Sequence, residues 1–403
     1  MSDSHSLSNR LRQLESVDWD FPGYVPNVNS QGINALHWYP APFPAALVGT
    51  LIDILGHGQG KYLDPFCGSG VGVVEAWLRG YEAVGNDSNY WATRIVQAKI
   101  DLLVGGAASR GSELAKSYEY FRRFNLTNWT SLAVEEIATA AGMSEESTKW
   151  FDAVVMAEIA CAKQWIAETD SATSPLLEVI FSSLLQKASI LRDVHYTYIV
   201  DRSRTKVAPT SPITFAKDFA TKLERSFRDA EVFRDELMAA GVDLPNWPAP
   251  RIIHGQSEAL GGQLSRDVDL VVTSPPYFGM NDYVRSQYLS HLVQPWVSFE
   301  DDLKVESGSR RNRRSPERLS HYLESMKSTF DSISESLSQD GHLAIVLGGS
   351  KSKLASAHNL VPGVQEMLQA AGLRLIWEGQ RRVRYRKINS GGHTSEVIWV
   401  YAR

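Results

Sequence analysis

The sequence predicts an α/β protein built on a doubly wound parallel sheet, with a mainly helical subdomain inserted into it. One observation is a glycine-rich turn between a short strand pattern and a helical pattern, within residues 61–78. A second is an apolar, β-branched run at residues 268–272, which has the length of a buried parallel strand. A third is the segment 105–250, which has a helical pattern and is far too long for a simple crossover.

Composition limits the class of protein. At 403 residues with 43% hydrophobic side chains, the chain can bury a core, and its net charge of −5 argues against a generally basic coat. Cys67 and Cys161 offer neither a disulfide framework nor a set of metal ligands, so we expect no metal and a reducing compartment. Residues 1–20 lack an apolar signal core, which predicts a cytoplasmic location, and residues 1–35 are expected to form a loosely ordered arm.

The first strand, turn and helix form a ligand-binding unit. A strand ending at Asp64 leads into Pro65, Phe66, Cys67 and the turn Gly68-Ser69-Gly70, whose glycines let the backbone approach a ligand at the following helix. The second strand, Glu82–Gly85, leads to Asp87. An acid at the tip of strand two can accept hydrogen bonds from both hydroxyls of a ribose. The alternative is that Asp87 caps the helix that begins near Tyr90.

A proline turn closes the later apolar strand. Residues 273–277 read Thr-Ser-Pro-Pro-Tyr, and two prolines cannot continue a sheet ladder. The chain therefore leaves the sheet at the carboxyl end of a parallel strand, where ligands bind in open α/β sheets. This turn exposes the Ser274 hydroxyl, the Pro275 carbonyl and the ring of Tyr277.

Together these two motifs resemble the cofactor loop and the catalytic motif of the DNA amino-methyltransferases. Those enzymes transfer a methyl group from S-adenosyl-L-methionine to the exocyclic amine of cytosine or adenine. A further segment, His37-x-Tyr39-Pro40-x-x-Phe43-Pro44, is similar to the element that closes over the methionine end of the cofactor in this family. The resemblance implies a seven-stranded, Rossmann-like methyltransferase sheet over residues 36–104 and 251–403. It also implies that the insertion 105–250 is a target-recognition subdomain.

The resemblance also implies which residues bind the cofactor. They are Phe43, Asp64, Pro65, Phe66, Gly68, Gly70, Asp87, Gln256 and Thr273. In one respect the chain departs from the family, because the acid that bonds the cofactor adenine after strand three is missing. The strand Arg251–His254 is followed by Gly255, Gln256 and Ser257, so a side-chain oxygen of Gln256 or Ser257 is expected to replace it.

The same motif implies the chemistry. Ser274 and the Pro275 carbonyl accept the amine hydrogens and localise the lone pair, while Pro276 and Tyr277 complete the turn. The target base is flipped out of the duplex and stacks on Tyr277. On that interpretation the Tyr277 hydroxyl is dispensable, and Tyr277→Phe keeps most activity. Methyl transfer is then a direct in-line displacement that depends on positioning, without a covalent enzyme intermediate.

The identity of the substrate stays open at this stage. Serine in the first place of the motif favours cytosine N4, and adenine N6 is the alternative. An RNA methyltransferase and a catalytically inactive DNA-binding regulator are further alternatives. Double-stranded DNA is the expected partner, a cognate restriction or defence nuclease is a candidate partner, and no membrane is expected.

Two arginine clusters are predicted to grip DNA phosphates. The first cluster lies in residues 307–318 and consists of Arg310, Arg311, Arg313 and Arg314. The second lies between the last two predicted strands and consists of Arg381, Arg382 and Arg384. The alternative for the first cluster is a solvated loop. Residues 137–151 also resemble a helix-turn-helix, but Glu145 and Glu146 at the start of its second helix would repel phosphates, so plain helical packing is favoured there.

Overall fold

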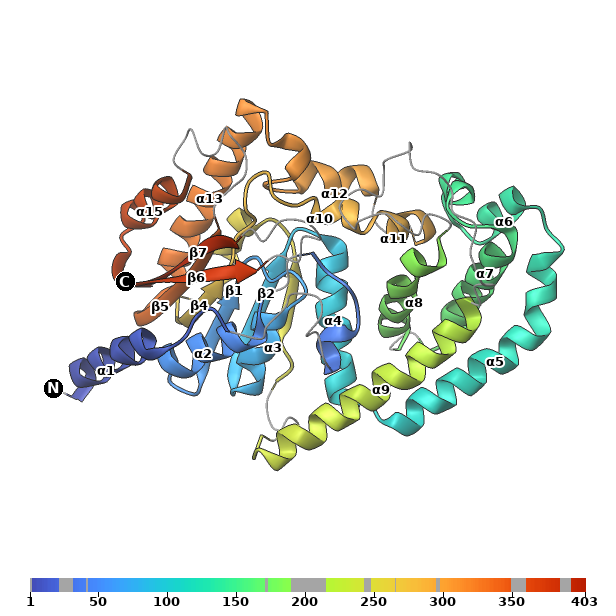
Figure 1. The fold of residues 1–403 in the computed structure, drawn as a ribbon, viewed down its shortest axis with the longest axis horizontal. Coiled ribbons are helices and arrows are strands. Elements are labelled where there is room, and N and C mark those ends of the chain that lie inside the picture. Colours follow the sequence, from blue (N-terminus) through green and yellow to red (C-terminus); the bar gives the residue numbers. More distant parts are fainter. Residues whose placement is uncertain are drawn as a thin grey trace.

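The strands form one mixed sheet. The computed structural model describes residues 2–21, 32–40, 43–170, 173–189, 215–242, 248–264, 266–294, 298–348, 360–384 and 393–403. Within them, the sheet has seven strands in the order β3-β2-β1-β4-β5-β7-β6 (Figure 1). The strands are β1 (Gly60–Asp64), β2 (Tyr81–Asp87), β3 (Arg251–His254), β4 (Val268–Thr273), β5 (Leu337–Gly348), β6 (Arg374–Arg384) and β7 (His393–Ala402).

Strand direction defines where a ligand can bind. β1 pairs in parallel with β2 and β4, β2 with β3, and β4 with β5, whereas β7 runs antiparallel to β5 and β6. The order reverses between β1 and β4, which is the topological switch point of a doubly wound sheet. The predicted fold class is therefore confirmed, and the carboxyl ends of β1 and β4 mark the expected crevice.

Helices cover the sheet and form the insertion. Those in the sheet-bearing part are α1 (Ser2–Ser16), η1 (Gly32–Ala35), α2 (Ala45–Leu55), α3 (Val71–Leu78), α4 (Tyr90–Gly105), η4 (Ser257–Gly262), α10 (Tyr283–Ser286), α11 (Tyr288–Val293), α12 (Phe299–Val305), η5 (Arg310–Asn312), α13 (Pro316–Ser336) and α15 (Leu360–Ala370). Those in the insertion are α5 (Ala108–Thr130), α6 (Val134–Ala140), η2 (Glu145–Lys149), α7 (Ala153–Glu168), α8 (Ser174–Ala188) and α9 (Phe215–Ala239). In the described residues no helix combines the length and apolar character needed to cross a membrane.

Both faces of the sheet are buried. In β4, Leu270 and Val272 belong to the core cluster that contains α2, α3 and α4, whereas Val271 belongs to the cluster of α13 and α15. Successive strand residues point to opposite faces, so a strand covered on both faces needs consecutive apolar residues. In β4 these are Leu270, Val271 and Val272.

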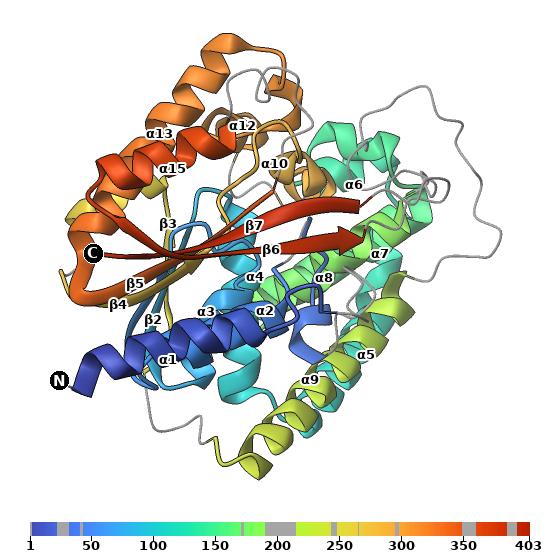
Figure 2. The same cartoon turned by 60° about the vertical axis from the view of Figure 1, so that its left-hand side comes forward.

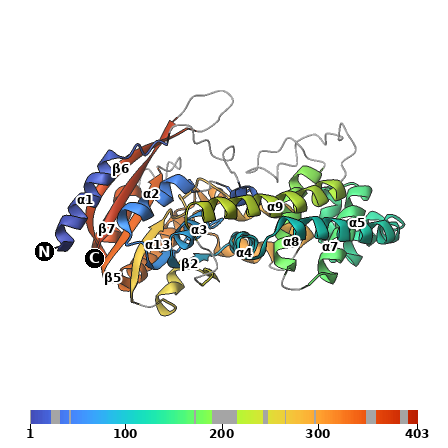
Figure 3. The same ribbon diagram turned by 90° about the horizontal axis from the view of Figure 1, so that it is seen from below.

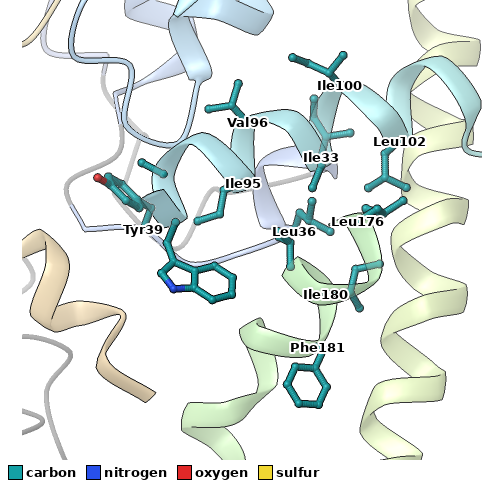
Figure 4. Close-up of a cluster of buried hydrophobic side chains, with 14 of the residues drawn as sticks. Ile33, Leu36, Tyr39, Ile95, Val96, Ile100, Leu102, Leu176, Ile180 and Phe181 are labelled. Atoms are coloured by element: carbon teal, nitrogen blue, oxygen red, sulfur yellow. The ribbon is translucent and has the colours of Figure 1, made fainter. Parts of the chain in front are cut away.

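The insertion shares the core of the sheet-bearing part. It extends from one end of the molecule (Figure 3), with α5 and α9 running side by side (Figures 1 and 2). At its base, Ile33 of η1 and Ile95 of α4 lie near Leu176 and Ile180 of α8 (Figure 4). One buried cluster contains all four of these side chains. The inserted helices are therefore packed onto η1 and α4 rather than joined only by a linker.

The N-terminal segment differs from the loosely ordered arm that was expected. It forms α1, which lies against α2 and β6 (Figure 2). Leu14 is fully buried, and Trp19 is 5% exposed with its ring 5.7 Å from that of Trp377. Polar composition concealed the few apolar side chains that fix the segment against the sheet.

The segment that resembled a helix-turn-helix is not one. After α6, Gly142 turns the chain at φ +60°, but the next element is η2, a 3-10 helix of only five residues. Trp150 and Phe151 are buried, and the Ser144 N–H donates to the Leu292 carbonyl. A recognition helix must present an exposed face to a groove. Plain helical packing is the correct interpretation.

Candidate active site

The two sequence motifs meet at the switch point. The Thr273 hydroxyl at the end of β4 donates to Asp64 Oδ1 at the end of β1, across 2.7 Å. The same oxygen accepts from the Phe66 N–H at 3.2 Å. Both Asp64 and Thr273 are buried, and burial raises the pKa of Asp64 to about 7. This bond ties the start of the glycine-rich turn to the residue that immediately precedes Ser274.

The glycine-rich turn needs its glycines. Gly68 and Gly70 have φ of +50° and +77°, in the left-handed region that favours glycine. A Cβ on Gly70 would lie 2.5 Å from Val96, which is a clash, and one on Gly68 would press on Tyr39 at 3.1 Å. Gly70 is also the N-cap of α3. The backbone thus passes close beneath Tyr39 and enters α3 without a side chain in the way.

Asp87 organises the same turn from strand β2. Its Oδ2 accepts from the Gly68 N–H and its Oδ1 from the Asn89 N–H, each at 2.8 Å. Burial raises the pKa of Asp87 to about 6, although the residue keeps partial solvent exposure. The N-cap of α4 is Asn89, whose side chain accepts from Trp91 N–H and Ala92 N–H. The helix-cap alternative for Asp87 is therefore wrong, and each carboxylate oxygen retains a lone pair for a ligand.

A buried lysine also supports the turn, and the sequence did not single it out. Lys99 Nζ donates to the Ser69 carbonyl at 2.7 Å and to Asn34 Oδ1 at 3.0 Å. Burial lowers the pKa of Lys99 to about 7. In the sequence, the only indication of a buried lysine here is that Lys99 interrupts an otherwise apolar face of α4, and that indication is weak. Lys99 joins η1 to the glycine-rich turn.

The His-x-Tyr-Pro segment lies over this turn. His37 is buried, with Nε2 3.1 Å from the Ser182 hydroxyl and Nδ1 2.7 Å from the Trp38 carbonyl. Burial lowers the pKa of His37 to about 3, so the ring is neutral. Tyr39 stacks on Tyr283 with ring centroids 5.9 Å apart, and Phe43 packs half-buried against the core. The segment is thus placed beside the glycine-rich turn.

The end of β3 adjoins Asp87. The Gly255 N–H donates to the Asp87 carbonyl at 3.0 Å. Of the two residues expected to replace the missing acid, Ser257 is buried with its hydroxyl 2.8 Å from that of Thr329. Gln256 is exposed. Gln256 is therefore the better placed of the two to meet a ligand.

The turn Ser274-Pro275-Pro276-Tyr277, which we call the catalytic turn after its predicted role, is held by residues distant in the sequence. The Ser274 hydroxyl donates to the Tyr277 hydroxyl at 3.1 Å, and the Tyr322 hydroxyl donates to the Pro276 carbonyl at 2.9 Å. Pro275 is buried and Pro276 is partly buried. The Tyr277 ring rests on Gly348, where a Cβ would come within 2.4 Å of Cε2. Gly348 pairs with Glu396 across β5 and β7, which brings Glu396 Oε1 to 3.3 Å from the Tyr277 hydroxyl.

Sequence reasoning missed Gly348 and Glu396. Both lie far along the chain from the proline turn, and only the register of β5 with β7 brings them to it. No local sequence motif indicates that either residue belongs to the site.

The second arginine cluster is divided between interior and surface. Arg381, predicted to bind DNA, is 4% exposed and its Nε lies 3.3 Å from Glu396 Oε2. Arg382 is exposed, and its Nε donates to Asp20 Oδ2 at 2.8 Å. Arg384 ends β6, and its side chain lies outside the described residues. Arg381 therefore does not share a surface with Arg382.

The first arginine cluster lies directly beside the catalytic turn. The Gly279 N–H donates to the Gly308 carbonyl at 2.7 Å, and the Arg310 N–H donates to the Asn281 carbonyl at 2.8 Å. Asp282 Oδ1 accepts from the Ser309 hydroxyl at 2.6 Å, which fixes the same contact. Arg311 and Arg314 are exposed, while Arg310 and Arg313 are partly buried: two of the four face solvent next to residues 276–282.

Fold and site together define a class of protein. A doubly wound sheet whose switch point joins a glycine-rich turn, a partly exposed carboxylate and a Ser-Pro-Pro-Tyr turn has the form of a Rossmann-like α/β methyltransferase. Residues 3–97 match the N6/N4 methyltransferase family model, described as DNA methylase. The chain is also 22% identical, over 320 residues, to the Type II methyltransferase M.MvaI of Kocuria varians. These findings support an amino-methyltransferase of the N4/N6 family.

The extent of each match differs. The alignment with M.MvaI covers 77% of this chain and 66% of that protein, so the chain matches about two thirds of the relative's length. Among solved structures, the rRNA methyltransferase aviRa of Streptomyces viridochromogenes aligns over 91% of this chain and 88% of its own, with 12% identity and a TM-score of 0.35.

Proposed function

We propose that this chain transfers a methyl group from S-adenosylmethionine to the exocyclic N4 amine of cytosine in DNA. The observation that supports this most directly is the hydrogen bond between Thr273 and Asp64. It brings the Ser-Pro-Pro-Tyr turn against the glycine-rich turn, so a cofactor on one and a base on the other would be neighbours. Methyl transfer without a covalent enzyme intermediate depends on that proximity.

The residues present suit the cofactor. Gly68 and Gly70 leave a backbone surface without side chains, and Asp87 offers a partly exposed carboxylate at the tip of β2 for the ribose hydroxyls. Gln256 would bond the adenine, and Phe43 would contact the methionine end. The cofactor, once bound, supplies an electrophilic methyl group on a sulfonium. Asp64 and Asp87 both bond to the backbone of the glycine-rich turn, so a cofactor held there would have two acidic side chains beside it.

Ser274 and Pro275 activate the base. The lone pair of an exocyclic amine is delocalised into the ring, so oxygen atoms that accept its hydrogens make it a better nucleophile. The Ser274 hydroxyl oxygen and the Pro275 carbonyl can both accept. Tyr277 offers its ring as a stacking surface for a base flipped from the duplex.

Arginines and the insertion would hold the DNA. Arg311 and Arg314 are exposed beside the catalytic turn, and with Arg310 and Arg313 they would contact phosphates. Arg382 lies near the carboxyl end of β6, the outermost strand of the sheet beside β7. The helical insertion would contribute target recognition. Since M.MvaI is a Type II methyltransferase, a role in restriction-modification with a cognate nuclease is part of the proposal.

Modified nucleosides test the function. DNA and RNA from cells that express the chain, and from matched cells that express Ser274→Ala, are digested and analysed by mass spectrometry. N4-methylcytosine in DNA, present with the wild type and strongly reduced with the variant, is the expected result. N6-methyladenine would overturn the choice of base, and new methylated nucleosides confined to RNA would overturn the choice of nucleic acid. The absence of any new methylated nucleoside would favour an inactive regulator.

A further inference from the structure

The Tyr277 hydroxyl lies at the centre of a hydrogen-bonded chain. Besides the Ser274 hydroxyl at 3.1 Å, the Val346 carbonyl lies 3.4 Å away and Glu396 Oε1 lies 3.3 Å away. Glu396 is partly buried, with its side chain 14% exposed. The stacking interpretation gave this hydroxyl no role, so its contacts need an explanation.

The number of protons available on these groups fixes the direction in which their hydrogen bonds run. A carbonyl and an ionised carboxylate can only accept, and a tyrosine hydroxyl has a single proton to donate. That proton is directed to Val346 or Glu396, so the bond between Tyr277 and Ser274 must use the proton of Ser274. The Ser274 oxygen then has only lone pairs left for a substrate.

Arg381 favours the ionised form of Glu396, which can only accept hydrogen bonds, at the far end of this hydrogen-bonded chain. Its Nε lies 3.3 Å from Glu396 Oε2, and its own side chain is 4% exposed. Burial raises the pKa of Glu396 above its ordinary value, and Arg381 and the bond from Tyr277 limit that rise. A buried guanidinium at this distance favours the carboxylate over the carboxylic acid.

We propose that Glu396, paired with Arg381, is the positioning residue that makes Ser274 an obligatory hydrogen-bond acceptor. The proposal rests on the function proposed above. An amine presents two hydrogens to such an acceptor, whereas a base with a carbonyl at the same place presents only lone pairs. The Glu396–Arg381 pair therefore favours exocyclic amines by fixing the direction of the hydrogen bonds through Tyr277 to Ser274, although neither residue contacts the base.

Glu396→Gln is the first test. The glutamine amide can donate a hydrogen bond to the Tyr277 oxygen. The Tyr277 hydroxyl can then donate its own proton to Ser274, which reverses the direction of the hydrogen bonds between these residues. The single-turnover rate constant on unmethylated plasmid DNA should fall about ten- to a hundredfold, the worth of a hydrogen bond to a charged group. Affinity for that DNA should be unchanged. Glu378→Gln is the matched control. This exposed carboxylate lies in the same β-hairpin, accepts a hydrogen bond from the Trp399 ring N–H at 3.0 Å, and is not part of the hydrogen-bonded chain through Tyr277.

Tyr277→Phe is the second test, and it leaves the Glu396–Arg381 pair intact should the first variant fold poorly. It keeps the stacking ring and removes the hydroxyl, so the rate constant should fall by a similar factor. The stacking interpretation predicts instead that most activity survives. Retention of full activity by folded Tyr277→Phe or by folded Glu396→Gln would overturn the proposal.

A double-mutant cycle separates positioning from general support of the structure. If Glu396 acts through Ser274, then Glu396→Gln should cause no further loss in a Ser274→Ala background. An equal loss in both backgrounds would overturn the proposal. If the wild-type chain itself transfers no labelled methyl group to DNA, the proposed function fails, and this inference fails with it. An active wild type with an unaffected Glu396→Gln variant rejects the inference alone.

Discussion

Two carboxylates shape the cofactor side of the site at the residue scale. Asp64 bonds Thr273 and so ties β1 to β4, whereas Asp87 bonds the Gly68 N–H and so ties β2 to the turn. Both are held in surroundings that raise their pKa, since burial disfavours the ionised form. A bound sulfonium would offset that cost. On the proposed function, the same two groups would serve both structure and cofactor binding.

Asp87 provides the first prediction. Asp87→Ala removes a charged acceptor for the ribose hydroxyls, so S-adenosylmethionine affinity should weaken by about 1.5 to 3 kcal/mol. Isothermal titration measures it. Asp101→Ala is the control, because that carboxylate lies on α4 and bonds Gln97 at 2.9 Å. Equal affinity in the folded Asp87 variant and the wild type would remove Asp87 from the binding site.

Asp64 provides a prediction about pH. Its pKa in the folded chain, about 7, lies above the usual value near 4, so the folded state binds more protons and loses stability as pH rises through this window. Asp64→Asn does not titrate. The free energy of unfolding of the variant, relative to wild type, should therefore increase by about 1.4 kcal/mol per pH unit between about pH 4 and 7. Above about pH 7 the difference should be constant.

Chemical denaturation across that pH range measures this difference. Asp20→Asn is the control, because Asp20 titrates below about pH 4 and its difference from wild type should be flat between about pH 4 and 7. The hydrogen bond from the Arg382 N–H lowers the pKa of Asp20, so wild type gains stability as pH rises toward 4. A pH-independent difference for Asp64→Asn would show that Asp64 ionises normally.

At the scale of elements, the segment from Gly308 to Arg314 forms a basic edge on the catalytic turn. Its backbone bonds to residues 279 and 281 fix it there. Replacing Arg310, Arg311, Arg313 and Arg314 with glutamine should weaken DNA binding at every sequence. The slope of log affinity against log salt should decrease by about 0.9 for each phosphate that the protein no longer neutralises.

Salt titrations of DNA binding provide the measurement. Arg266 and Arg374 are exposed and stand at the amino ends of β4 and β6, at the edge of the sheet away from the site. Replacing these two with glutamine should leave the slope unchanged. If the four-residue variant keeps the wild-type slope, the segment is a solvated loop.

The elements themselves could be predicted from local pattern, and their partners could not. Apolar β-branched runs and glycine turns placed the strands, because burial and turn chemistry act locally. Glu396 could not be foreseen, since it reaches Tyr277 only through its register with Gly348. Arg381 was expected on the surface with Arg382. Neighbouring residues in a strand face opposite sides, so one of the two had to point inward, and an acidic partner offset the cost of burying Arg381.

At the scale of the whole molecule, the insertion and the sheet-bearing part share one hydrophobic core. Ile95 of α4 is fully buried in the cluster that also contains Leu176, Ile180 and Phe181 of α8. Helices α8 and α9 both contact α4, and α9 also contacts η1. A boundary drawn at residues 105 and 250 from chain length alone cannot show this, because loop length says nothing about which apolar faces meet.

A shared core predicts shared unfolding. Ile95→Ala leaves a cavity at the junction and should destabilise the chain by about 2 to 5 kcal/mol. The loss should appear as a shift of one denaturation midpoint, the same by far-UV circular dichroism and by limited proteolysis. Val104→Ala is the matched control, because Val104 lies on the same helix with 62% of its surface exposed and should shift neither probe. Suppose instead that Ile95→Ala lets protease remove α5 to α9 while the two remaining fragments, which together contain the seven strands, stay associated and unfold at the wild-type midpoint. The insertion would then be an independently folding domain, and the continuous cluster around Ile95 would contribute little to the stability of the sheet.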